Sequence, residues 1–131
     1  MNLPDHLVDS LVRVAEHHPE IRAIYLFGSQ ATGTARPDSD VDVGVLYASP
    51  QPLARTLRLE DEIAQVLGPK VDVVDVAASG AFLALEIVRG ERVFCRDSTE
   101  TDVFELYVLR RAGDLLPYEL ERQALLGLST R

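Results

Sequence analysis

Residues 24–46, IYLFGSQATGTARPDSDVDVGVL, carry the strongest structural signal in this chain. Two apolar runs, 24–27 and 41–46, are joined by a polar segment that starts with Gly28-Ser29. Ten residues separate Ser29 from Asp40-Val41-Asp42, where the second run begins. The apolar runs predict two strands joined by a loop. A glycine-serine turn after a strand can bring backbone N–H groups and a hydroxyl close to a phosphate.

The two aspartates give this loop its chemistry. Side chains at positions i and i+2 of a strand point to the same face, so Asp40 and Asp42 would place two carboxylates together. Such a pair repels unless a cation lies between its members, and hard oxygen ligands combined with substrate phosphates are the usual way to hold Mg²⁺. The segment therefore predicts nucleotidyl transfer. A polar surface loop with a turn at 38–40 is the alternative interpretation.

The stretch 26–43, LFGSQATGTARPDSDVDV, resembles the nucleotidyltransferase signature of the DNA polymerase beta-like superfamily. The resemblance is closest to the minimal nucleotidyltransferases, or MNT proteins, and runs from near residue 10 to near residue 95. One departure is visible, because Thr32 stands where these proteins often have a basic residue, although Arg36 is nearby. The resemblance implies the nucleotidyltransferase fold, a mixed sheet flanked by helices with the metal site on one edge.

The resemblance also implies roles for the residues of the loop. The hydroxyl of Ser29 and the adjacent amides would bind the β- and γ-phosphates of the nucleotide, and Gly28 would let the backbone approach closely. Gly33 is either a second tight turn or an ordinary loop glycine. Ser39 would either touch phosphate or cap a turn. Arg36 would either neutralise triphosphate charge or remain a solvated surface residue.

A third carboxylate is expected from the strand predicted at 71–76, which contains Asp72 and Asp75. They are three residues apart, so on a regular strand they point to opposite faces and only one can face the metals. The superfamily pattern places an acidic residue inside this strand, which favours Asp72. Asp40, Asp42 and Asp72 would then hold two Mg²⁺ ions, and the third carboxylate would help deprotonate the attacking hydroxyl. The alternative is that Asp72 and Asp75 only solubilise an edge strand.

The length and net charge of the chain limit the classes of protein to which it can belong. The chain of 131 residues is expected to form a single domain, with a core at about 10–95 and a helical part at about 98–128. Its net charge of −8 argues against direct nucleic-acid binding and suits a partner with a basic surface. The sequence shows neither a signal peptide nor an apolar stretch of the ~20 residues that a membrane span needs, so a cytoplasmic location is expected.

The periodicity of the apolar residues predicts an α/β or α+β domain of two layers. In the helix at 53–67, Leu53, Leu57, Ile63, Val66 and Leu67 are expected to face inward. A helix after 97–99 is expected to break or kink at Pro117, with a last helix at 118–126. The complete set of predicted elements comprises helices at 5–17, 53–67 and 79–89, the C-terminal helices, and strands at 21–27, 41–46, 71–76 and 92–95.

The leading hypothesis for function is a Mg²⁺-dependent nucleotidyltransferase that uses ATP. The MNT resemblance implies that it is the antitoxin of a HEPN–MNT toxin–antitoxin pair, which transfers AMP to a tyrosine of its partner, a HEPN-domain ribonuclease toxin. Two alternatives remain open. One is a small-molecule nucleotidyltransferase that resembles the aminoglycoside-modifying enzymes. Those enzymes usually have an extra helical region for the acceptor, and here only residues 98–131 could play that part. The other is a non-catalytic antitoxin that neutralises its toxin by binding, with the apolar C-terminal helix as its interface. Both homo- and hetero-oligomers are compatible with the sequence.

Overall fold

The computed structural model describes residues 3–28 and 40–127. Within these ranges four strands form one mixed sheet in the order β3-β2-β1-β4. β1 is antiparallel to both of its neighbours, whereas β2 is parallel to β3. The strand bounds are β1 Ile21–Phe27, β2 Val41–Tyr47, β3 Val71–Asp75 and β4 Glu91–Cys95. All four predicted strands are confirmed, and their ends differ from the prediction by at most one residue.

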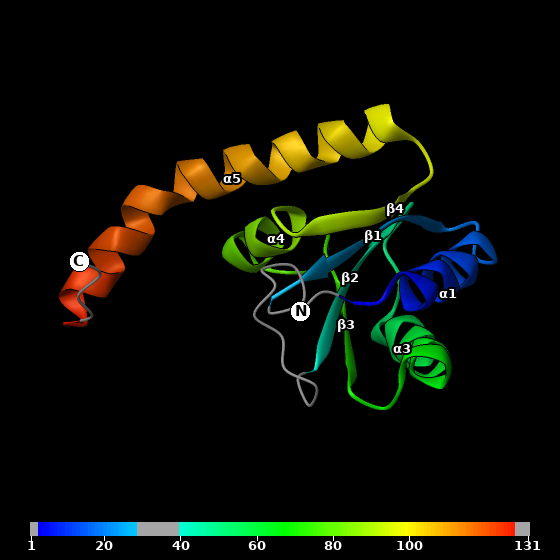
Figure 1. The fold of residues 1–131 in the computed structure, drawn as a ribbon. Helices are drawn as coiled ribbons and strands as arrows, with labels where there is room; N and C mark the ends of the chain where they lie inside the picture. Colours follow the sequence, from blue (N-terminus) through cyan, green and yellow to red (C-terminus); the bar gives the residue numbers. More distant parts are fainter. Residues whose placement is uncertain (1–2, 29–39, 128–131) are drawn as a thin grey trace.

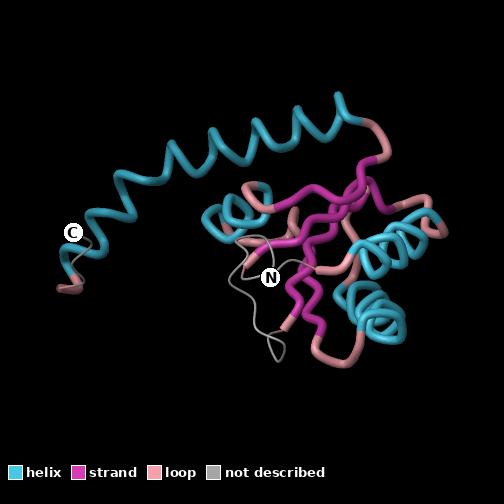
Figure 2. Tube along the Cα trace, in the orientation of Figure 1, coloured by secondary structure: helices cyan, strands magenta, loops and turns pink. Residues whose placement is uncertain are grey.

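Helices cover both faces of this sheet (Figures 1 and 2). α1 (Asp5–Glu16) and α3 (Leu53–Leu67) pack on one face, and α4 (Ala81–Val88) and α5 (Ser98–Leu125) lie on the other. A separate apolar core fills each interface. The predicted fold class is confirmed, but the domain has three layers where two were expected.

Successive side chains of β2 point to opposite faces of the sheet, so its valines and Asp42 lie on different faces. Val43 and Val45 are fully buried in the core formed with α1 and α3. Asp42 and Gly44 alternate with them and therefore face α4 and α5. A β-carbon at Gly44 would lie 2.4 Å from Cγ2 of Ile87, so the missing side chain lets α4 pack close to the sheet.

The inward face of α3 differs from the prediction. Of the five residues predicted to face inward, Leu53, Leu57 and Val66 are 73, 50 and 41 % exposed. Ile63 is fully buried and Leu67 packs against the core, as predicted, and Leu59, which was not in the predicted set, is also fully buried. Thr56 is also buried, because its hydroxyl forms a 2.9 Å hydrogen bond with the hydroxyl of Tyr47. A polar residue thus lies on the packing face, which is why counting apolar residues alone selects a stripe that is rotated toward solvent.

The C-terminal part is one bent helix and not two. The helix begins after an N-cap at Asp97, whose Oδ1 accepts a 3.1 Å hydrogen bond from the backbone N–H of Glu100. Pro117 lies inside α5 and has no N–H to donate to the carbonyl of Gly113. The helix bends along its C-terminal part without ending (Figure 1). No helix in the described part of the chain has both the length and the hydrophobicity that a membrane crossing requires.

Candidate active site

Asp42 and Asp72 lie side by side on neighbouring strands. They are directly paired in the parallel register of β2 and β3, so their side chains leave the sheet on the same face. That face is the one that α4 and α5 cover, because the alternating valines fill the opposite core. Asp42 is partly buried and Asp72 is exposed. The arrangement offers two carboxylates, one of them open to solvent.

Asp75 does not join this pair. Its register partner is Val45, whose side chain belongs to the core on the α1 and α3 face. Its Oδ1 accepts a 3.4 Å hydrogen bond from the backbone N–H of Ala78, at the start of the connection to α4. Burial raises the pKa of the Asp75 carboxyl, and hydrogen bonds from the amides of Ala78 and Ala77 oppose that rise. Asp75 thus shapes a turn on the other side of the strand.

Gly28 follows β1 and lies against the Asp42 carboxylate. Its φ of 67° is in the left-handed region, which glycine adopts without steric cost. A β-carbon at this position would lie 2.5 Å from Oδ2 of Asp42, which is closer than two such atoms can approach. The conformation therefore favours glycine, and any side chain here would force the Asp42 carboxylate to move. The chain turns away from β1 with its backbone directly beside the carboxylate.

The surroundings of Asp42 are electrostatically unfavourable for its own charge. Burial raises the pKa of the Asp42 carboxyl most, followed by the negative charges of Asp72, Asp40 and Glu86. A cation would relieve this repulsion. Because Mg²⁺ is commonly bound through one or two carboxylates together with substrate phosphates, the donor set fits Mg²⁺ held jointly with a nucleotide. Within residues 3–28 and 40–127 no three acidic, His or Cys side chains are grouped as a metal site, so the structure does not gather Asp40, Asp42 and Asp72 into one such group.

Glu86 was not predicted from the sequence. It is an exposed residue of α4, and it contributes to the charge around Asp42 because this helix packs against β1, with its Ile87 beside Gly44 of β2. One signal was present, since Glu86 is the single charged residue in the apolar helix sequence AFLALEIV. Glu86 is far from the aspartates in the sequence, so nothing in the sequence indicated that it lies near Asp42.

The structure describes only some of the other predicted site residues. Asp40 immediately precedes β2 and is exposed. Ser29, Arg36 and Ser39, predicted to contact phosphate, lie outside the described residues, as does Gly33. Their roles remain predictions.

Comparisons with known proteins agree with this geometry. The family described as "Polymerase beta, Nucleotidyltransferase" matches residues 9–99. The protein adenylyltransferase MntA of Shewanella oneidensis is 30 % identical over 109 residues, which cover 82 % of this chain and 76 % of that protein. MntA of Thermococcus cleftensis is 33 % identical over 69 residues, or 53 % of this chain and 70 % of that protein.

Solved structures share the fold over nearly the whole chain. A crystal structure of a toxin–antitoxin with AMP-PNP has a TM-score of 0.76 at 26 % identity and covers 95 % of this chain and 97 % of that one. A tri-AMPylated Shewanella oneidensis HEPN toxin in complex with MNT antitoxin has a TM-score of 0.73 at 22 % identity, covering 94 % and 95 %. Because the family match spans residues 9–99 and includes both aspartate-bearing strands, the chain belongs to the polymerase beta nucleotidyltransferase family.

Proposed function

We propose that the chain is a Mg²⁺-dependent protein adenylyltransferase, an antitoxin that transfers AMP from ATP to a tyrosine hydroxyl of a HEPN ribonuclease toxin. The observation that carries the proposal is the register pairing of Asp42 with Asp72, with the Gly28 backbone against the Asp42 carboxylate. The 30 % identity to a protein adenylyltransferase and the fold shared with a toxin–antitoxin structure containing AMP-PNP support it. The cytoplasm, which contains ATP and the RNA that a ribonuclease would cut, is the proposed location.

The proposed reaction is a displacement at the α-phosphorus of ATP. The tyrosine oxygen forms a bond to this phosphorus, the bond to the bridging oxygen of the β-phosphate breaks, and pyrophosphate leaves. Asp72, the more exposed carboxylate of the pair, would accept the phenolic proton. When bound, Mg²⁺ supplies neutralisation of the charge on the reacting phosphates.

The remaining residues would bind and align the nucleotide. Asp40, Asp42 and Asp72 would hold the metal, and the backbone at Gly28 would allow the triphosphate to approach the sheet. Ser29, Arg36 and Ser39 would contact phosphate oxygens. Most of the rate enhancement would come from this alignment and charge neutralisation, because phosphoryl transfer asks little covalent chemistry of the protein.

The test is AMP transfer to a protein acceptor. The purified chain is incubated with Mg²⁺, ATP and the HEPN-domain product of the neighbouring gene, and intact-mass spectrometry reports whether the partner gains AMP groups. Asp42→Asn should lower the transfer rate by roughly a thousandfold, because it removes a metal ligand. Asp75→Asn is the matched control and should retain transfer, since this residue faces the opposite side of β3.

Each outcome bears on a different interpretation. Transfer that survives Asp42→Asn would overturn the proposal. A stable complex without any transfer would indicate an antitoxin that acts by binding alone. Turnover of aminoglycosides, without transfer to protein, would indicate a small-molecule enzyme.

A further inference from the structure

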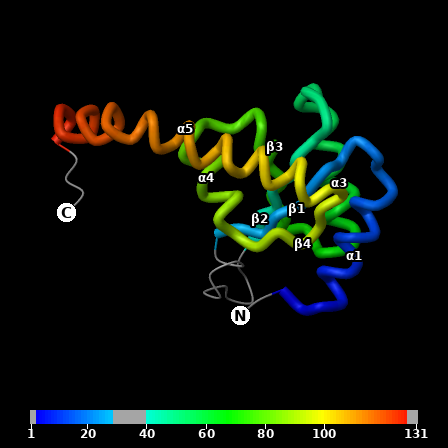
Figure 3. Tube along the Cα trace, turned by 90° about the horizontal axis from the view of Figure 1, so that it is seen from above, coloured from blue at the N-terminus to red at the C-terminus, as the bar shows by residue number. Residues whose placement is uncertain are grey.

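α5 carries most of the exposed large apolar side chains of the described residues. It buries only Thr101, Val108 and Ala112, and beyond these it extends past the sheet with no described helix or strand beside it (Figures 1 and 3). A helix with apolar residues on several sides is typically covered by protein. The exposed set on α5 is Val103, Leu106, Tyr107, Leu109, Leu115, Leu116, Tyr118, Leu120 and Leu125, followed directly by Leu126 at the helix end.

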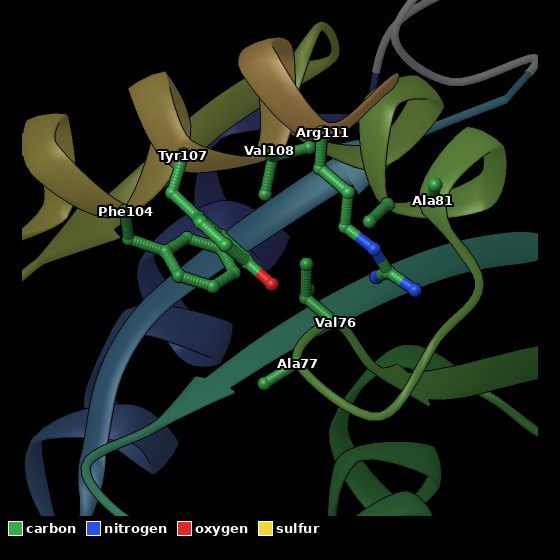
Figure 4. Close-up of a pocket in the computed structure, with 8 residues that line it drawn as sticks. Val76, Ala77, Ala81, Phe104, Tyr107, Val108 and Arg111 are labelled. Atoms are coloured by element: carbon green, nitrogen blue, oxygen red, sulfur yellow. The ribbon is translucent and has the colours of Figure 1, made fainter. Parts of the chain in front are cut away.

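A pocket of about 250 Å³ lies at the inner edge of this surface, between α5 and the start of α4 (Figure 4). Val76, Ala84 and Val108 form apolar walls. The hydroxyl of Tyr107 and the guanidinium of Arg111 both point into it (Figure 4). Arg111 makes no ion pair with any residue that the structure describes. Pockets of this kind, with aromatic and arginine side chains at their rim, are typical anchor points of protein interfaces.

The pocket opens on the same face of the sheet as the carboxylates. Val76 follows Asp72 by four residues and belongs to the apolar core on the α4 and α5 face. α4 contributes Ala84 to the pocket and Glu86 to the surroundings of Asp42. A protein bound along α5 would therefore lie over the face that carries Asp42 and Asp72.

We propose that α5 is the docking surface for the protein acceptor, which inserts an apolar side chain into the pocket and places a carboxylate beside Arg111. The proposal rests on the proposed function, which requires a protein acceptor near the aspartates. A second copy of this chain fits less well, because two chains of net charge −8 repel each other. The acceptor has no such restriction, and the pocket and the aspartate pair share one face of the sheet.

The experiment measures the dissociation constant for the same HEPN-domain protein by calorimetry, without ATP so that no AMP is transferred. Leu106→Asp and Arg111→Glu alter exposed α5 positions, so the fold should tolerate them. Each should weaken binding by at least about 30-fold, as expected for residues at the centre of an interface. Leu53→Asp is the matched control, because Leu53 is 73 % exposed on α3, on the other face of the sheet. It should change binding by less than about threefold.

The remaining measurements separate the two proposals. All three variants should retain Mg²⁺–ATP binding, which shows that the fold and nucleotide site are intact. If Leu106→Asp and Arg111→Glu bind the toxin as tightly as the parent chain, the docking proposal is wrong. It is also wrong if they abolish self-association in light scattering and leave toxin binding unchanged, since the surface then belongs to a second copy. If Asp42→Asn binds the toxin and still neutralises it fully, the catalytic function fails and the docking surface stands.

Discussion

At the residue scale, the Asp42 carboxyl is held in surroundings that disfavour its charge. Its pKa in the folded chain is raised above the ordinary value of 3.8 by burial and then by Asp72, Asp40 and Glu86. When the pKa of a carboxyl is higher in the folded than in the unfolded chain, the carboxyl stabilises the fold at pH values below its unfolded-state pKa. This stabilisation is lost as the pH rises through the pKa of the folded state. The metal-free protein should therefore carry an electrostatic cost at neutral pH that is absent near pH 3.8 and below.

Asp42→Asn should remove this cost. In EDTA at pH 7 the variant should be more stable than the parent chain by less than about 1 kcal/mol, because solvent screens a partly exposed carboxylate. The difference should shrink toward pH 4, and urea unfolding at both pH values measures it. A variant that is less stable than the parent at pH 7 would show that Asp42 makes a favourable contact in the metal-free state.

With Mg²⁺ and ATP present, the parent chain should become more stable than Asp42→Asn. A ligand at a hundred times its dissociation constant stabilises the folded state by about 2.7 kcal/mol. With ATP present, Mg²⁺ should therefore raise the melting temperature of the parent chain and of Asp75→Asn, but not that of Asp42→Asn. Equal responses from the two variants would place the metal elsewhere.

Gly28 should tolerate no side chain. Gly28→Ala places a methyl group 2.5 Å from Oδ2 of Asp42 and requires a left-handed conformation, which alone costs an L-residue roughly 1–2 kcal/mol. We expect lower stability in urea unfolding together with loss of AMP transfer. Gly80→Ala is the control, because Gly80 has a φ of −64° and open space around its α-carbon. If both variants transfer AMP at the parent rate, the backbone at Gly28 does not position the Asp42 carboxylate.

At the element scale, α5 is fixed to the sheet by a polar network. The buried Tyr25 hydroxyl on β1 donates a 2.7 Å hydrogen bond to Oε2 of Glu105. Arg92 on β4 donates to Glu105 at 2.9 Å and to Asp102 at 2.8 Å. Burial, followed by the hydrogen bond to Glu105, raises the pKa of Tyr25, so its hydroxyl keeps the proton that it donates.

Tyr25→Phe should loosen α5 in particular. Loss of a hydrogen bond to a charged group costs roughly 1.5–3 kcal/mol. Amide hydrogen exchange should accelerate around residues 101–112 more than elsewhere. Tyr47→Phe is the matched control, since its hydroxyl bonds to Thr56 on α3, and its effect should appear there. Equal acceleration in both helices would show that the network stabilises the fold as a whole.

Pro117 should act only on the outer part of α5. Proline inside a helix removes one backbone hydrogen bond and costs about 3 kcal/mol. Pro117→Ala should therefore raise the helical signal in circular dichroism and slow amide exchange from residue 113 onward. Exchange around residues 101–112 should not change. Faster exchange after residue 113 would mean that the bend itself is favourable.

The strands could be predicted from the sequence because their signal is local. Alternating valines around Asp42 and Asp72 predicted the strands, and the spacing of three residues between Asp72 and Asp75 predicted that they face opposite sides. The packed face of α3 could not be predicted, since Thr56 is buried only through its bond to Tyr47 on another element. Glu86 was missed for a similar reason, because a contact between α4 and the sheet depends on the tertiary fold.

At the scale of the whole molecule, the two faces of the sheet carry different features. The α1 and α3 face is closed by a network in which Arg55 donates to Nδ1 of His18 at 2.9 Å, and Nε2 of His18 pairs with Glu62 at 2.8 Å. Since Nδ1 accepts, Nε2 carries the proton that it donates to Glu62. The other face carries the aspartate pair and the apolar surface of α5. Chemistry and recognition of the acceptor are therefore expected on one side of the protein.

Net charge and apolar surface should affect different steps of binding. The charge of −8 acts over a Debye length and should accelerate encounter with a basic partner, whereas the apolar contacts of α5 form only in the docked complex. Raising the salt concentration from about 50 to about 500 mM should slow association with the toxin by roughly tenfold and leave dissociation nearly unchanged. Leu106→Asp should do the opposite, with faster dissociation and the same salt dependence of association. Stopped-flow binding measures both rates. Association that does not respond to salt would mean that the acidic surface has no part in finding the partner, and recognition would then rest on α5 alone.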